Sequence, residues 1–122
     1  MKTVAVIGAS SNREKFGNKA LRAFARQGYT VIPINPAEAE VEGFRAYRSV
    51  LDVPHPIDMA TLYVPPAVGV RVIDELLKKG VPEVWLNPGA DSRQVVEKAR
   101  ALGLKTVQHC SIMAIGASPA RY

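Results

Sequence analysis

The chain has 122 residues, of which 48% are hydrophobic and 22% are charged, and these values are typical of one globular domain. No apolar run reaches the roughly 20 residues of a membrane span, and no secretory signal pattern precedes the first predicted strand. Cys110 is the only cysteine, so no disulfide can form within the chain, which favours a cytoplasmic protein. We therefore expect one cytoplasmic domain over residues 1–122, with no membrane partner.

The net charge of +5 is unevenly distributed. Residues 1–30 hold six basic side chains and one acidic one, whereas the charges of the remaining residues cancel. Such a concentration of positive potential favours an anionic ligand near the N-terminal segment. The alternative is a solvated helix face that happens to be basic. The chain has no dense Lys/Arg run with interleaved aromatic residues, so we do not expect a nucleic-acid partner.

Predicted strands and helices alternate along the whole chain. Apolar, largely β-branched runs predict the strands, and apolar residues at helical spacing predict the helices. Gly28, Gly80 and Gly103 mark helix ends. Residues 37–53 are less regular, with a short extended piece near Val41 and a short helix near residues 48–51. In chain order we expect strands over residues 3–7, 29–34, 58–64, 83–86 and 105–108, helices over residues 18–27, 66–79 and 91–102, and a short final helix over residues 111–117.

This alternation predicts an α/β fold, a Rossmann-like doubly wound five-stranded parallel sheet with the order 3-2-1-4-5 in a single domain. Ligands of such sheets lie beyond the carboxyl ends of the strands. The unusual polar, glycine and proline residues of this chain fall at those ends, which predicts one site. They are Gly8-Ala9-Ser10, Asn35-Pro36, Pro65-Pro66, Asn87-Pro88-Gly89 and His109-Cys110.

The first strand runs into Gly8 and small hydroxyl residues and then into a helix, the ingredients of a phosphate site. The spacing departs from the dinucleotide motif G-x-G-x-x-G because Gly17 follows a longer loop, and Asn35 stands where NAD enzymes carry an acid. Both departures disfavour NAD. Arg13 or Lys15 in the longer loop can meet additional phosphate charge. The alternative is that Gly8 only makes a tight turn.

The same residues resemble a known family, the small stand-alone CoA-binding proteins, and are similar to the CoA-binding domain of succinyl-CoA synthetase α subunits. The resemblance covers almost all 122 residues. It implies a Rossmann-like fold that binds coenzyme A or an acyl-CoA. The segments that carry it are Gly8-Ala9-Ser10, Lys15-x-Gly17, Gly28-Tyr29-x-Val31-x-Pro33-x-Asn35-Pro36, Gly43, Tyr47, Asp58, Tyr63-Val64-Pro65-Pro66, Gly80, Val84-Trp85 and Cys110.

The resemblance also implies roles for individual residues. Many family members have Gln-x-Gly where this chain has Asn87-Pro88-Gly89, and the synthetase has a basic residue where this chain has Ala37-Glu38-Ala39-Glu40. We therefore expect Arg13 to meet the 3′-phosphate. By the resemblance, Gly8, Ala9, Ser10, Arg13 and Lys15 surround the phosphates, Asn35 and Pro36 lie by the adenosine with Pro65 and Pro66 at the adjoining edge, and Asn87, Pro88 and Gly89 line the pantetheine side. The expected CoA site also includes Gly17, Val64 and Cys110, with Cys110 close to the pantetheine arm.

Cys110 is the one candidate for covalent chemistry. Its thiol can form a mixed disulfide with CoA or receive an acyl group, and the neighbouring His109 can favour the thiolate. The alternative is a small, half-buried and inert cysteine. The chain shows neither a G-x-S-x-G elbow nor the spacing of a metal site.

Three function classes follow from these observations. The first is binding without turnover, as a CoA carrier, a sensor or an accessory subunit of a larger enzyme, because no self-contained catalytic apparatus is recognisable. The alternative is a small NAD(P)-dependent or CoA-thiol redox enzyme. A third class is an interaction module whose pocket is vestigial. The protein partner is left open between a second copy of the chain and a larger enzyme.

Overall fold

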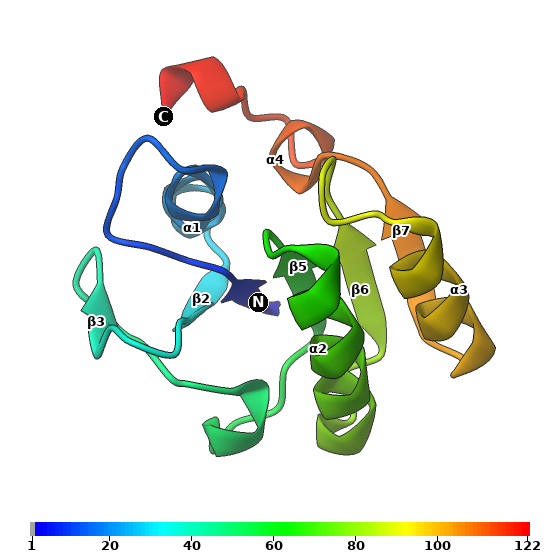
Figure 1. The fold of residues 1–122 in the computed structure, drawn as a ribbon. Helices are drawn as coiled ribbons and strands as arrows, with labels where there is room; N and C mark the ends of the chain where they lie inside the picture. Colours follow the sequence, from blue (N-terminus) through cyan, green and yellow to red (C-terminus); the bar gives the residue numbers. More distant parts are fainter. Residues whose placement is uncertain (1) are drawn as a thin grey trace.

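The computed structural model describes residues 2–122, and its elements alternate between strand and helix as predicted (Figure 1). Within this part of the chain, no helix is long and apolar enough to cross a membrane. The elements are β1 (Thr3–Ile7), α1 (Phe16–Arg26), β2 (Thr30–Ile34), β3 (Glu40–Val41), β4 (Phe44–Arg45), η1 (Val50–Asp52), β5 (Met59–Leu62), α2 (Pro66–Lys79), β6 (Glu83–Leu86), α3 (Arg93–Ala101), β7 (Lys105–Gln108), α4 (Ser111–Ala114) and η2 (Pro119–Arg121).

Five parallel strands form the sheet in the order β2-β1-β5-β6-β7, which confirms the predicted Rossmann-like fold. One assignment within it differs. We expected the strand over residues 58–64 at the outer position beside β2, but β5 pairs with β1 instead. Tyr47 occupies that outer position through a single parallel bridge to Ile34. Counted with Tyr47 as the third member and β5 as the fourth, the order reads 3-2-1-4-5-6, which extends the 3-2-1-4-5 pattern by one member.

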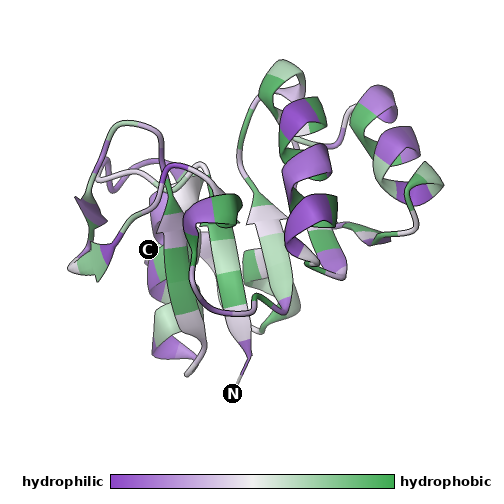
Figure 2. Cartoon of the chain, turned by 90° about the horizontal axis from the view of Figure 1, so that it is seen from below, coloured by the Kyte–Doolittle hydropathy of each residue, from purple (hydrophilic) through white to green (hydrophobic). Residues whose placement is uncertain are grey.

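Alternate residues of the central strands face two separate apolar cores. Val4 and Val6 pack under α1 and α4, and Ala5 and Ile7 pack under α2 and α3 on the opposite face of the sheet. This alternation follows from the two-residue repeat of a strand. The apolar strands lie between helices with hydrophilic outer sides (Figure 2). Because helices cover both faces of the sheet, the carboxyl ends of the strands remain open for a site.

The ends of the helices differ slightly from those predicted. Helix α1 begins at Phe16 and therefore reaches further towards the loop after β1. Helix α3 begins after Ser92, whose hydroxyl accepts a hydrogen bond from the amide of Val95 at 3.3 Å. Asp91, where we expected this helix to begin, instead accepts from the amide of Gly89 and closes the preceding turn. Both residue types cap helices, so their order along the turn decides which one does.

Candidate functional site

Two glycines allow the chain to double back at the end of β1. Gly8 has a φ of +93°, and a Cβ atom there would lie 2.4 Å from the carbonyl oxygen of Tyr63. A Cβ atom on Gly17 would lie 2.2 Å from the carbonyl oxygen of Gly8. Both distances are far below van der Waals contact, so only glycine fits at either position. The first turn of α1 therefore packs directly against the end of β1.

Two amide side chains fix the loop between β1 and α1. Asn18 is fully buried and donates a hydrogen bond of 2.8 Å to the carbonyl oxygen of Ser10. Asn35 donates one of 2.8 Å to the carbonyl oxygen of Ala9. Lys15 precedes α1 without a side-chain cap on the helix; the amide of Asn18 donates to the Lys15 carbonyl oxygen, and the amides of Phe16 and Gly17 are left for another acceptor. The loop thus presents a fixed set of donors beside a lysine ammonium.

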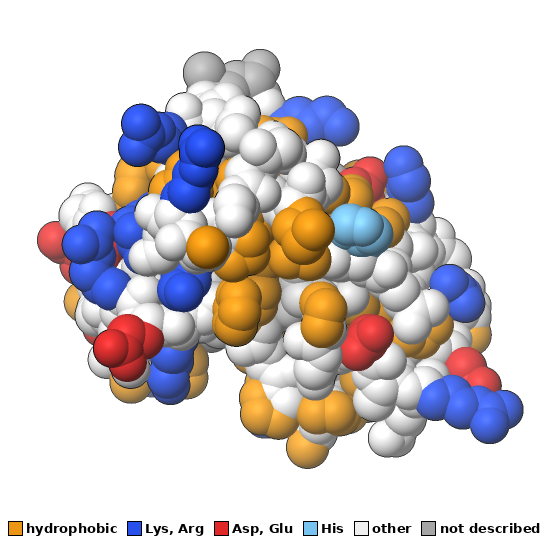
Figure 3. All heavy atoms as spheres, turned by 90° about the horizontal axis from the view of Figure 1, so that it is seen from above, with side chains coloured by type: hydrophobic (Ala, Val, Ile, Leu, Met, Phe, Trp, Pro, Cys, Tyr) orange, Lys and Arg blue, Asp and Glu red, His pale blue; other side chains and the backbone are white. Residues whose placement is uncertain are grey.

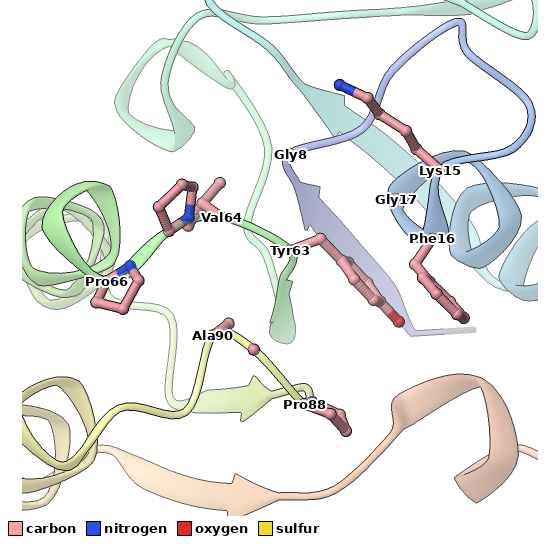
Figure 4. A pocket seen from close by; sticks show the side chains of 11 residues that line it. Gly8, Lys15, Phe16, Gly17, Tyr63, Val64, Pro66, Pro88 and Ala90 are labelled. Atoms are coloured by element: carbon pink, nitrogen blue, oxygen red, sulfur yellow. The ribbon is translucent and has the colours of Figure 1, made fainter.

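Two clefts meet at the end of β1. The larger has a volume of about 550 Å³ and the smaller about 150 Å³, and both are lined by Gly8 and Val64. Figure 4 shows that the larger cleft is built from three connections, which follow β1, β5 and β6. Its lining consists of Gly8, Lys15, Phe16, Gly17, Tyr63, Val64, Pro65, Pro66, Pro88, Gly89 and Ala90.

The structure brings most of the predicted site residues to these clefts. Pro36 lines the smaller one. Ala9 is fully buried, and Ser10 accepts from the amide of Asn12. The predicted residues that line the larger cleft are Gly8, Lys15, Gly17, Val64, Pro65, Pro66, Pro88 and Gly89.

Six predicted residues lie outside both linings, namely Ala9, Ser10, Asn35, Arg13, Asn87 and Cys110. Arg13 is largely exposed and pairs with Glu42, with 3.3 Å between Nε and Oε2. Asn87 is 1% exposed, and its side chain makes internal hydrogen bonds. Cys110 is half-buried at the start of α4, and the Nδ1 atom of His109 lies 2.9 Å from its carbonyl oxygen.

A buried group of polar side chains supports the wall of the larger cleft. The hydroxyl of Ser111 shares hydrogen bonds of 2.7 Å with Thr61 and 3.0 Å with Tyr63. Asn87 donates to Thr61 at 2.6 Å and to the carbonyl oxygen of Leu62 at 2.9 Å, and it accepts from the amide of Ser111 at 2.8 Å. These bonds tie β5, the end of β6 and the start of α4 together. Thr61 and Ser111 are not among the predicted site residues, because single polar residues within apolar segments give no pattern.

Tyr63 provides a titration test of this arrangement. Burial raises its pKa from 10.0 to about 12. The folded protein keeps the phenol proton to higher pH than the unfolded chain does, so the stability that Tyr63 contributes is complete below about pH 10 and is lost as the pH rises through about 12. Of the four tyrosines, we expect Tyr63 to contribute a late step in an absorbance titration of tyrosinate. That step should vanish in Tyr63→Phe, and its persistence there would show that another tyrosine is responsible.

Comparison with known proteins identifies a family and individual relatives that match almost the entire chain. The model of the CoA binding domain family matches residues 2–117. The acetate–CoA ligase (ADP-forming) I of Archaeoglobus fulgidus is 33% identical over 116 residues, which are 87% of this chain and 17% of the ligase. The α subunit of acetate–CoA ligase (ADP-forming) II of Pyrococcus furiosus is 30% identical, over 85% of this chain and 25% of the subunit. The chain thus spans a quarter or less of these relatives.

Solved structures include relatives of the same size as well as larger enzymes. A conserved hypothetical protein of Pyrococcus furiosus superposes with a TM-score of 0.86 at 32% identity, covering 93% of this chain and 99% of that one. An acetyl-coenzyme A synthetase of Ca. Korarchaeum cryptofilum superposes with a TM-score of 0.78 at 30% identity, covering 88% of this chain and 25% of the synthetase. By its sequence, its fold and the cleft at the end of β1, this chain belongs to the CoA binding domain family.

Proposed function

We propose that this chain binds coenzyme A or an acyl-CoA, as a non-catalytic carrier, sensor or accessory subunit in the cytoplasm. The observation that carries the proposal is the meeting of two unequal clefts at Gly8. CoA has a nucleotide at one end and a pantetheine arm at the other, joined by a pyrophosphate. A ligand of that shape fits with its pyrophosphate over the loop and one end in each cleft.

The chemistry of the loop suits the pyrophosphate. Gly8 and Gly17 let β1, β5 and α1 approach one another closely, and the amides of Phe16 and Gly17 and the helix dipole favour negative charge there. The Lys15 ammonium extends along the edge of the cleft (Figure 4). Beyond the loop, Pro88 offers apolar surface to a pantetheine arm, and Pro65 and Pro66, which we expected on the adenosine side, line the same cleft. Each part of the ligand thus has a matching part of the protein.

A binding role without turnover rests on the lining of the larger cleft. The titratable side chains of this lining are Lys15 and Tyr63. Burial raises the pKa of the Tyr63 phenol, which therefore stays protonated at neutral pH. Cys110 lies outside the lining. The ligases that this chain resembles are more than three times its length, so we assign their chemistry to other parts of those proteins. A second copy of this chain or a larger enzyme would then be the partner.

Calorimetry with CoA, acetyl-CoA, NAD, NADP and ATP tests the proposal. We expect CoA and acetyl-CoA to bind and NAD and NADP to bind far more weakly. Asn35 stands where NAD-binding proteins carry an acidic residue that hydrogen-bonds the ribose hydroxyl. Lys15→Gln should weaken CoA by about tenfold, the effect of one charge-assisted hydrogen bond.

The matched control is Lys19→Gln, which removes an equal charge one turn further along α1. The Lys19 ammonium lies over the Phe16 ring, 5.4 Å from its centroid, and Lys19 is outside the lining of the larger cleft. We expect Lys19→Gln to leave CoA affinity nearly unchanged. Tight binding of NAD(P) without CoA would overturn the proposal, and equal losses in the two variants would remove Lys15 from contact with the ligand.

A further inference from the structure

The smaller cleft is lined by two arginines from different parts of the chain. Arg48 follows the bridge residue Tyr47, and Arg71 lies on α2. We propose that Arg48 and Arg71 together bind a phosphate monoester on the ribose of the nucleotide, so that the protein selects CoA over dephospho-CoA. This inference rests on the proposed function and assigns to these two residues the contact expected of Arg13.

The backbone holds Arg48 beside the end of β2. The amide of Tyr47 donates to the carbonyl oxygen of Pro33 at 3.0 Å, and the amide of Asn35 donates to the carbonyl oxygen of Tyr47 at 2.9 Å. In Rossmann-like folds the ribose of a nucleotide lies at this end of the second strand, where an arginine can accommodate a ribose phosphate. Arg48 is therefore in the region where a 3′-phosphate would arrive.

The charges at the smaller cleft favour an anion. Within residues 2–122, the side chains of Arg48 and Arg71 form no hydrogen bond, ion pair or ring contact, and both residues are exposed. The third charged residue of the lining, Glu75, accepts a hydrogen bond of 2.5 Å from the hydroxyl of Ser49. Arg13, by contrast, already has Glu42 as its partner. Two arginines without internal partners against one carboxylate leave this cleft positive.

The interior of the smaller cleft is apolar. Ile7, Ile34, Val64, Val68 and Val72 supply its walls. An adenine ring can pack on such surface, while a phosphate requires the guanidinium groups, which form planar pairs of hydrogen bonds with phosphate oxygens. The base then lies inside the cleft and the ribose phosphate lies outside it, within reach of both arginines. An apolar interior beside exposed guanidinium groups therefore suits a nucleotide that carries a phosphate on its ribose.

Calorimetry with CoA and dephospho-CoA tests the assignment on the whole chain. We expect the wild type to prefer CoA by about 10- to 100-fold, because charge-assisted hydrogen bonds disappear with the 3′-phosphate. Arg48→Gln and Arg71→Gln should each lower the affinity for CoA by about tenfold and leave dephospho-CoA nearly unchanged. The double variant should bind the two ligands equally. Lys78→Gln, which removes an exposed positive charge from the same helix, is the control and should retain the preference.

The possible outcomes distinguish the roles of Arg48 and Arg71 from CoA binding itself. Binding of CoA and dephospho-CoA with equal affinity by the wild type would overturn the roles of Arg48 and Arg71 and leave CoA binding intact. Parallel losses for both ligands in the arginine variants would also overturn these roles, because a contact with the 3′-phosphate cannot affect a ligand that lacks it. Failure of the wild type to bind either ligand would overturn the proposed function and this inference with it.

Discussion

Replacing Gly8 by alanine is expected to lower the free energy of unfolding by about 2–5 kcal/mol. Two costs add at this position. The φ of +93° is unfavourable for any residue with a Cβ atom, by about 1–2 kcal/mol. The new methyl would also lie 2.4 Å from the Tyr63 carbonyl oxygen, and relieving such overpacking typically costs about 1–3 kcal/mol. Urea denaturation followed by circular dichroism measures the loss.

Gly28→Ala separates these two costs. Gly28 has the same φ of +93°, but a Cβ atom there meets nothing within 4 Å. We expect this control to lose only the backbone contribution of about 1–2 kcal/mol. Equal losses in the two variants would show that β1 and β5 can separate to accept the methyl group. Because Gly8 affects folding, Lys15 is the better residue for testing ligand binding.

Asn87→Ala is expected to lower the free energy of unfolding by about 2–4 kcal/mol. The side chain is 1% exposed and is the acceptor for the amide of Ser111 and a donor to the carbonyl oxygen of Leu62. Its removal leaves both buried backbone groups without this partner, at about 1–3 kcal/mol for each group. Urea denaturation again provides the measurement.

Asn12→Ala is the control for this loss. Asn12 is exposed, and its side chain accepts a hydrogen bond of 3.0 Å only from the nearby amide of Glu14. We expect a change within about 1 kcal/mol, since water can replace that bond. A similarly small loss for Asn87→Ala would mean that water or a shift of α4 satisfies the freed groups.

Much of the fold can be predicted because local patterns determine it. Apolar runs and helical spacing identify all five long strands and the three main helices. The order of the strands is harder to predict, since pairing depends on contacts far apart in sequence. Tyr47 extends the sheet by one bridge within an irregular segment, and this leaves β5 free to pair with β1. No periodicity marks a single-residue bridge.

The glycine turn is the most predictable part of the site. Gly8 and Gly17 are needed for backbone contact, and a strand-to-helix turn reveals that need in the sequence. The direction of a side chain is not revealed in this way. Asn87 follows a strand as its neighbours Pro88 and Gly89 do, yet its amide points into the interior. Arg71 belongs to an ordinary helical pattern, and only the packing of α2 brings it to the smaller cleft.

Positive charge gathered along the sequence is partly neutralised in space. Glu38 accepts hydrogen bonds from the amide and the hydroxyl of Ser11, and Ser11 and Lys15 lower its pKa. Glu42 pairs with Arg13 and accepts from Asn18 at 3.0 Å. Blue and red side chains accordingly lie close together on the face in Figure 3. A polyanion lying across this face would encounter these two fixed carboxylates, so we expect it to adsorb weakly there, whereas a small anion at the end of β1 would avoid them.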